Sequence, residues 1–437
     1  MKKSPYIMIL LALIVLIIIS EAAPLLGLTN QPYFHENLLR QLFNTQLFPP
    51  ACLGSILAYL LLLPTRKKEL IITIIVGVAF ELILRHYKPI FVSSLTSCKP
   101  GTGIFDQLIF TGPGLLLSCI LAILGRIFQA YKLNNPKELQ TNLEILSLSI
   151  AMPVLLCLDA LVSNQAVYDP YLYAIDSLWG VQISFVITKL LRSNSFYSFF
   201  MEVIYYYLPL WMILAQILIY RSNTKLGLSH NKYLVPALFF IVIAIGGTIS
   251  YHFIPAVGLE FYCGSNLFPN GPWPPVNMNP HPLELPPYFP RNSMPSLHFA
   301  WILAAYYSLY RFKAIYKNVA LVFVVLTALS ALSVGCHYIV DLIMSVPLCT
   351  VALALVIVEA PNKIRLLSGL WGIVATLSWF YLFRHHIVIL LTHPLSTKFW
   401  LCLTDFVSFA LLYFLCRQSY QRNFRQQPKQ DHKETKA

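Results

Sequence analysis

Charged residues are scarce in this sequence. Only 11% of its 437 residues are Asp, Glu, Lys or Arg, whereas about 25% is usual for a soluble domain. Hydrophobic residues make up 57% of the chain. This composition excludes an ordinary soluble protein and predicts a chain that crosses a lipid bilayer several times.

Acidic residues are scarcer than basic ones, with 18 Asp and Glu against 31 Lys and Arg and a formal net charge of +13. Such a charge also occurs in nucleic-acid-binding proteins, but the sequence contains no nucleic-acid-binding motif. The basic residues form short clusters between apolar segments, as the positive-inside rule predicts for membrane proteins. We therefore expect a lipid bilayer, and no nucleic acid, as a partner.

Closely spaced cysteine pairs are also lacking. The nine cysteines include no C-x-x-C pair, which argues against the common zinc and redox motifs. Most of them lie in apolar runs and are predicted to be small core residues. Cys98 and Cys263 fall in loops expected on the same side of the membrane, and the sequence leaves open whether they form a disulfide.

Apolar runs fill most of the chain, many of them close to the roughly 20 residues that span a bilayer as a helix. They lie near residues 6–28, 50–64, 69–86, 105–127, 142–163, 198–220, 233–255, 298–310, 318–338, 339–358, 365–383 and 398–416. Small residues lie near Ser20, within the first run. This run is either a cleaved signal peptide or, as we favour, a retained helix. The sequence thus predicts an all-α polytopic membrane protein with about twelve transmembrane helices.

The basic clusters determine the expected orientation, because all of them fall on one side when these helices are counted in order. The clusters are Arg66–Lys68, Arg126–Lys137, Arg221–Lys232, Arg311–Lys317, Lys363–Arg365 and the tail from Arg417. Both termini are then cytoplasmic. The same count brings His298 and His337 to the outer face.

Three segments outside the apolar runs have distinct compositions. Residues 164–197 are aromatic and half apolar, which predicts a helix lying along the membrane interface. The proline-rich loop 255–295 is predicted to form an ordered lid without regular helix or strand. The tail from about Gln418 is rich in Gln, Lys and Arg and is predicted to be disordered.

His337 and Asp341 are four residues apart, so they share one face of a helix, or sit in a turn if the helix breaks at the outer surface. A carboxylate on one ring nitrogen fixes the histidine tautomer and leaves the other nitrogen as a base or nucleophile. The pair alone is equally typical of two polar residues that satisfy each other near a membrane surface.

A second polar segment precedes the run at 298–310. Ser296 is a natural N-cap whose helix end favours phosphate binding, and His298 lies in the first turn, where it could hold a proton against a leaving oxygen. Arg291 carries a planar donor fork suited to phosphate oxygens. Each residue alone fits a structural role as a cap, a first-turn histidine or an interfacial arginine. Together with His337 and Asp341 on one face, they predict phosphoryl transfer on a lipid headgroup.

The motifs Pro295-Ser296-Leu297-His298 and His337-Tyr338-Ile339-Val340-Asp341 resemble two signatures of the type 2 phosphatidic acid phosphatase superfamily, Pro-Ser-x-His and His-x-x-x-Asp. Within it, the Met294–Ala300 segment and the second motif look most like inositolphosphotransferases related to fungal inositol phosphorylceramide synthase. Segments 253–258 and 169–176 are similar to that branch as well. The resemblance covers roughly residues 143–358 and implies a six-helix core.

With that core included, the sequence predicts four parts. These are N-terminal transmembrane helices over 1–141, a phosphatidic-acid-phosphatase-like catalytic core over 142–358, C-terminal transmembrane helices over 359–417, and a cytoplasmic basic tail over 418–437.

The resemblance also implies a role for each site residue. His337 attacks phosphorus to form a phosphohistidine, and Asp341 orients it. His298 protonates the departing alcohol and later deprotonates the acceptor. Ser296 and Arg291 hold the phosphate oxygens. No metal or other cofactor is required.

The chain departs from the phosphatase signatures at two places. Ala331 stands six residues before His337, where the signature has an arginine, and the first signature, a lysine with an Arg-Pro pair, has no clear match. Phosphate binding is then left to Arg291 and the helix end. Lys189 and Arg192 are further candidates, although interfacial cations at these positions need no such role.

Three functions follow as hypotheses. The first is a lipid phosphotransferase that moves a phosphorylated headgroup from a membrane phospholipid to an acceptor alcohol on the outer, periplasmic or lumenal, side. The second is a lipid phosphate phosphatase with water as acceptor, against which Ala331 argues mildly. The third is a lipid transporter or scramblase, which predicts ionisable residues at mid-helix depth; Asp159 and Glu202 are candidates, but both fall near predicted helix ends.

Overall fold

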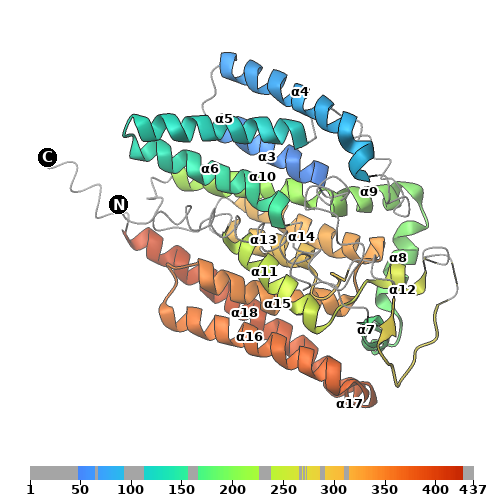
Figure 1. The fold of residues 1–437 in the computed structure, drawn as a ribbon. Coiled ribbons are helices and arrows are strands. Elements are labelled where there is room, and N and C mark those ends of the chain that lie inside the picture. Colours follow the sequence, from blue (N-terminus) through green and yellow to red (C-terminus); the bar gives the residue numbers. More distant parts are fainter. Residues whose placement is uncertain are drawn as a thin grey trace, which may run out of the picture. The chain divides into compact units, whose positions relative to one another are not determined.

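A computed structural model describes residues 48–63, 67–92, 113–155, 166–225, 238–264, 268, 271, 273–285, 291–309 and 314–426. These residues are mainly helical (Figure 1). The predicted first run, with its alternative as a signal peptide, lies outside the described residues. The chain divides into two compact units, Met1–Leu161 with Tyr206–Ser222, and Val162–Tyr205 with Asn223–Ala437. The four predicted parts stay a prediction.

Unit 1 is a packed set of apolar helices. Its described elements are α3 (Phe48–Leu62), α4 (Lys67–Val92), α5 (Pro113–Lys132), α6 (Pro136–Leu155) and most of α10 (Leu208–Lys225). Tyr59, Ile123 and Ile145 are fully buried in its core. Arg126 of α5 reaches Glu69 of α4 through two hydrogen bonds, of 2.6 Å from Nε and 2.5 Å from Nη2. This bidentate pair joins the two helices at one end.

Unit 2 contains the predicted site and begins with short elements. These are β1 (Ala166–Val167), α7 (Asp169–Ser177), α8 (Ile183–Arg192) and α9 (Ser195–Tyr206), followed by α11 (Leu238–Phe253), α12 (Leu259–Cys263) and β2 (Leu283–Glu284). β1 and β2 pair antiparallel, with Ala166 opposite Glu284. The remaining elements are α13 (Leu297–Leu309), α14 (Ala314–Val334), α15 (Ile339–Val356), α16 (Asn362–His385), α17 (Ile387–Thr392) and α18 (Pro394–Gln426).

Helix α15 lies at the centre of unit 2. It packs against α11, α13, α16 and α18 (Figure 1), and most of its side chains are buried. Gly372 allows α16 to approach closely, because an added Cβ there would lie only 2.6 Å from the carbonyl oxygen of Pro347 in α15. The helix that starts just after His337 is therefore held from several sides.

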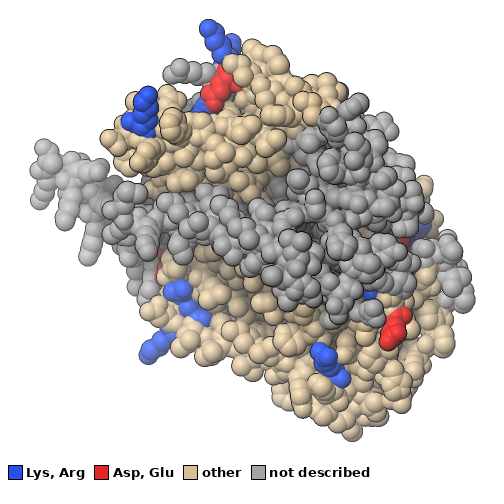
Figure 2. All heavy atoms as spheres, viewed as in Figure 1, with Lys and Arg blue, Asp and Glu red and all other residues tan. Residues whose placement is uncertain are grey.

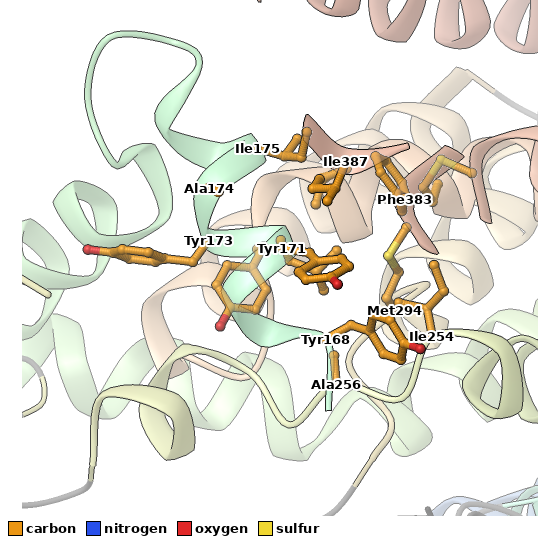
Figure 3. Packing of buried hydrophobic residues seen from close by; sticks show 14 of the residues in the cluster. Tyr168, Tyr171, Tyr173, Ala174, Ile175, Ile254, Ala256, Met294, Phe383 and Ile387 are labelled. Carbon is orange, nitrogen blue, oxygen red and sulfur yellow. The ribbon is translucent and has the colours of Figure 1, made fainter. Parts of the chain in front are cut away.

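A buried cluster joins α7 to the loops before α12 and α13 (Figure 3). It includes Tyr171 of α7, Ile254, Met294 and Phe383 of α16. The backbone N–H of Tyr168 donates to the carbonyl of Pro255 at 2.8 Å. Burial of these large apolar side chains fixes the short helix α7 beside the segments that lead to the predicted site.

Helices occupy all or part of each predicted apolar run within the described residues. Five of them are long and apolar enough to span a membrane, namely 114–132, 314–334, 339–356, 362–385 and 394–419, and α9 with α10 adds a sixth if the pair forms one span. Among the described residues in view, charged side chains are sparse on an otherwise uncharged surface (Figure 2). The chain is an integral membrane protein, while the count of about twelve spans stays a prediction.

Four predictions about local structure were wrong in part. The run 198–220 contains two helices, because α9 ends at Tyr206 and α10 begins at Leu208. The single interfacial helix predicted over 164–197 is replaced by α7, α8 and the start of α9, with a turn at Gly180, whose φ is +89°. The glycine adopts this conformation without the strain of a Cβ.

The loop 255–295 contains the one-turn helix α12 and the strand β2, although neither was expected. The prolines of this loop lie outside residues 259–263, so nothing prevents a helical turn there. Similarly, α18 continues to Gln426, past the predicted start of disorder at Gln418. The segment 418–426 contains neither proline nor glycine and includes good helix formers. Residues 427–437 lie outside the described part of the chain.

Candidate functional site

His337 lies in the short turn between α14 and α15. Tyr338 is the N-cap of α15 and Asp341 occupies its third helical position, where the carboxylate Oδ2 accepts the Tyr338 N–H at 2.8 Å. Of the two predicted arrangements, the pair therefore has the second, in which the histidine precedes the helix. The capping bond holds the carboxylate beside the turn.

The tautomer of His337 follows from its backbone contact. Its Nδ1 lies 2.8 Å from the carbonyl oxygen of Ser293. Because a carbonyl only accepts, Nδ1 must carry the proton, and Nε2 then holds a lone pair. Asp341 Oδ2 lies 3.5 Å from Nδ1, and the two side chains are 0% and 2% exposed, respectively. A positive charge formed on the ring would thus have a carboxylate next to it.

Ser293 connects the histidine to the carboxylate. Its hydroxyl donates to Asp341 Oδ2 at 2.5 Å, and its N–H donates to the carbonyl of Ala256 at 3.0 Å. Ser293 was not predicted from the sequence, because a single serine in a polar loop carries no spacing signal. Its backbone carbonyl and its hydroxyl act on different members of the site.

Ser296 and His298 lie at the start of α13, as predicted. Ser296 Oγ is 3.4 Å from the N–H of Phe299, a long capping contact, and the Ser296 N–H donates to the carbonyl of Asp341 at 3.2 Å. The ring centroids of His298 and His337 are 6.0 Å apart. The buried Nε2 of His298 has no hydrogen-bond partner among the described residues. The structure therefore brings both predicted histidines to one place.

Tyr205, from the end of α9, contacts both histidines. Its ring stacks on His298 with centroids 4.2 Å apart and an interplanar angle of 14°, and its hydroxyl lies 3.4 Å from His337 Nε2. Tyr205 was not predicted from the sequence, since one more tyrosine in an aromatic apolar run is not distinctive.

Arg291 is almost fully buried, with 1% of its surface exposed. Its Nη2 donates to the carbonyl of Leu285 at 2.8 Å. Burial lowers its pKa, and the charge of Asp169 acts in the opposite direction. Arg291 lies in the loop before α13, two residues before Ser293. Its contact with a phosphate stays a prediction.

The two further basic candidates are both on α8. Lys189 is exposed, whereas Arg192 pairs with Glu202 at 3.7 Å and covers the ring of Phe268 at 5.6 Å. These contacts fit the alternative of interfacial cations. Ala331 is fully buried in α14. Asp159 lies outside the described residues, as does Cys98, whereas Cys263 carries a free thiol.

Asp169 is a buried acceptor that joins three segments around His337. Its carboxylate accepts the N–H of Val257 at 3.0 Å, the N–H of Gly258 at 2.8 Å and the hydroxyl of Tyr338 at 3.0 Å. Burial raises the pKa of Asp169 to about 7, although these hydrogen bonds favour the charged form. From the sequence, this segment was predicted to be an interfacial helix and resembled the inositolphosphotransferase branch, but no role was predicted for Asp169.

Gly258 and Asp176 also support the turn that carries His337. Gly258 has a φ of +90°, and an added Cβ would lie 2.4 Å from the carbonyl oxygen of Cys336. Asp176 accepts the N–H of Ser184 at 3.0 Å, and Ser184 Oγ accepts the N–H of Ile339 at 2.9 Å. Burial raises the pKa of Asp176 to about 6. Helices α7 and α8 thus hold the start of α15.

This geometry describes an integral membrane protein with a buried histidine and carboxylate site at the ends of apolar helices. Residues 170–355 match the family model of the PAP2 superfamily. This region runs from α7 to α15 and includes His298, His337 and Asp341, and the match confirms the resemblance at the superfamily level. It fits a lipid phosphatase or phosphotransferase. No curated protein and no solved structure matches the chain.

Proposed function

We propose that the protein is a lipid phosphotransferase that moves a phosphorylated headgroup from a membrane phospholipid to an acceptor alcohol, through a phosphohistidine on His337. The observation that carries this proposal is the bond from His337 Nδ1 to the Ser293 carbonyl. It leaves the lone pair on Nε2, near the unpartnered Nε2 of His298 in a buried site. An imidazole held in this way is prepared to act as a nucleophile.

In the first step, His337 Nε2 attacks the phosphorus of the donor lipid. A nitrogen–phosphorus bond forms, and the bond between phosphorus and the oxygen of the lipid alcohol breaks. The departing oxygen takes a proton from His298. The positive charge on the phosphorylated ring is stabilised by Asp341, whose Oδ2 lies 3.5 Å from Nδ1.

In the second step, the acceptor hydroxyl gives its proton to His298, and its oxygen bonds to phosphorus. The nitrogen–phosphorus bond breaks, which restores His337, and the single proton taken from the acceptor leaves His298 protonated as at the start. Arg291, Ser296 and the first-turn amides of α13 hold the phosphoryl oxygens in this proposal. Water in place of the alcohol would give the lipid phosphate phosphatase as an alternative. The resemblance to inositolphosphotransferases favours the alcohol.

We further propose that the site faces the outer side of the membrane and that both termini are cytoplasmic. The positive-inside distribution of the basic clusters supports this orientation. It also fits the separation of the site from Lys363 and Arg365, which follow the opposite end of α15.

A transport function is the second candidate, on one specific observation. Asp405 lies inside the apolar span 394–419, and its buried Oδ1 has no hydrogen-bond partner in the described part of the chain. Ionisable residues at such depth are typical of transport pathways. The positions of the site residues argue against a transport pathway, since His298 and Asp341 lie in the first turns of their helices. Movement of a fluorescent phospholipid across vesicles by the His337→Ala protein tests this candidate.

The main experiment follows the phosphoenzyme. The purified full chain in detergent micelles is incubated with phosphatidic acid or phosphatidylinositol radiolabelled at phosphorus, and then denatured. We expect an acid-labile label on the protein that His337→Ala abolishes. His393→Ala replaces an exposed histidine outside the site and keeps the label. Persistence of the label in His337→Ala would refute the assignment, and product identity with and without added glycerol separates transfer from hydrolysis.

A further inference from the structure

Tyr205 contacts the site in a way that the two proposed steps do not use. It is 6% exposed, and its ring lies nearly parallel to that of His298, with an interplanar angle of 14°. The same residue places its hydroxyl 3.4 Å from His337 Nε2. One side chain thus contacts both the proposed nucleophile and the proposed acid.

The direction of the Tyr205 contact is set by the other side of the imidazole. Because His337 Nδ1–H donates to the Ser293 carbonyl, Nε2 accepts and the tyrosine hydroxyl must be the donor. A separation of 3.4 Å is long for a hydrogen bond from a hydroxyl. The hydroxyl therefore loses little interaction energy when a stronger acceptor arrives.

A phosphorus atom that reacts with Nε2 must approach along the same lone pair that Tyr205 now contacts. The oxygens bound to that phosphorus then come within reach of the Tyr205 hydroxyl, which lies 3.4 Å from the nitrogen that they approach. The neighbouring Nε2 of His298 is also buried and without a partner among the described residues. The Tyr205 hydroxyl and His298 Nε2 thus both lie near the nitrogen at which an oxygen-rich tetrahedral group would bind.

From this geometry we propose that Tyr205 is a further catalytic residue, whose hydroxyl donates a hydrogen bond to an oxygen of the phosphoryl group while the bond to His337 forms. The stack on His298 holds the phenol in position. Tyr205 keeps its proton throughout, so no further group is transferred. This proposal rests on the proposed phosphotransfer and adds to it a direct contact with the phosphoester group of the substrate.

The test is the single-turnover rate of phosphoenzyme formation with phosphatidic acid or phosphatidylinositol radiolabelled at phosphorus. Tyr205→Phe keeps the stacked ring and removes only the donor. A hydrogen bond to a charged oxygen predicts a rate about 10- to 100-fold lower, at an unchanged concentration dependence on the lipid. Tyr171→Phe, which alters another buried tyrosine of unit 2, should react like the unaltered protein.

A second substitution separates catalysis from folding. Ring-fluorinated tyrosine at position 205 keeps the shape of the side chain and makes its hydroxyl a stronger donor, so a change in the labelling rate without a change in the unfolding temperature supports the proposal. Labelling of Tyr205→Phe at the normal rate would overturn it while leaving the phosphohistidine intact. Failure of the unaltered protein to form any phosphoenzyme would instead overturn the proposed function and, with it, the role of Tyr205.

Discussion

At the scale of single residues, two different groups share the task of preparing His337. The backbone carbonyl of Ser293 accepts the Nδ1 proton at 2.8 Å, whereas the carboxylate of Asp341 lies farther away at 3.5 Å. A main-chain acceptor does not change when the side chain is replaced. The tautomer is therefore set by a main-chain contact, whereas a positive charge on the ring is balanced by a side chain that substitution can remove.

Ser293→Ala and Asp341→Asn test this division. Ser293→Ala removes the hydroxyl that donates to Asp341 Oδ2 but keeps the carbonyl, so we expect phosphoenzyme formation to slow by about tenfold. Asp341→Asn removes the charge next to the phosphorylated ring, and we expect a decrease of about 100-fold or more. Single-turnover labelling measures both. Equal rates in the two proteins would contradict the separation of roles.

Asp169 makes stability depend on pH. Burial raises its pKa from 3.8 to about 7, so the folded state binds more protons than the unfolded state between these values, and stability falls as pH rises through this window. The neighbouring ionisable groups are Asp341, Tyr338, Arg291, Tyr262 and Cys263. We expect Asp169→Asn to flatten this dependence.

Thermal unfolding in detergent at about pH 5 and at about pH 8 measures the effect of Asp169. In Asp169→Asn, stability should still fall somewhat as pH rises, because burial also raises the pKa of Asp176 to about 6. An unchanged slope in Asp169→Asn would show that other groups cause the dependence.

At the scale of elements, the site depends on a close approach between the loop before α12 and the turn after α14. Gly258 lies at this approach, with a φ of +90°, and Gly180 has a similar φ of +89° but no atom within 4 Å of an added Cβ. The two glycines share the backbone conformation and differ in their surroundings. They form a matched pair for separating backbone strain from contact with the site.

We expect Gly180→Ala to destabilise the protein by about 1–2 kcal/mol through backbone strain alone. Gly258→Ala adds a contact of 2.4 Å with the Cys336 carbonyl, so it should unfold at a lower temperature and label more slowly, because the turn carrying His337 must shift. Unfolding midpoints and phosphoenzyme labelling measure the two effects. Equal behaviour of the two variants would contradict the proposed role of the approach.

The long apolar helices were predictable because a bilayer demands both length and composition, and α14, α15 and α16 lie where the sequence placed them. His298, His337 and Asp341 came from motifs whose spacing is local. No local motif pointed to Tyr205 or Asp169, because their importance depends on contacts across 132 and 169 residues, respectively. The one-turn helix α12 was missed because prolines elsewhere in its loop dominated the composition.

At the scale of the whole protein, the ends of α15 differ in chemistry. Its first turn carries Asp341, and its last carbonyls, of Ala354 and Leu355, accept hydrogen bonds from Arg365 at 3.0 and 3.3 Å. These positions are about 21 Å apart along an α-helix, most of the hydrocarbon thickness of a bilayer. The proposed outer site and the basic cluster thus occupy opposite ends of one buried helix.

Cysteine labelling tests the proposed orientation. Glu284 of β2 and Lys363 at the start of α16 are both exposed. In sealed cells, we expect a membrane-impermeant maleimide to label Glu284→Cys but to label Lys363→Cys only after permeabilisation. The unsubstituted protein controls for the native cysteines. Labelling of Lys363→Cys alone in sealed cells would reverse the orientation.

The bond between Asp169 and Tyr338 also has a consequence for biosynthesis. The two residues are 169 positions apart, so at about 5–20 residues per second the ribosome makes the carboxylate roughly 10–30 s before its tyrosine partner. During that interval α7 and α8 are already synthesised, but the N–H of Ile339 and the hydroxyl of Tyr338 do not yet exist. The contacts that hold the start of α15 therefore form only after this helix has been made, and a nascent chain released before residue 337 contains His298 without the proposed nucleophile.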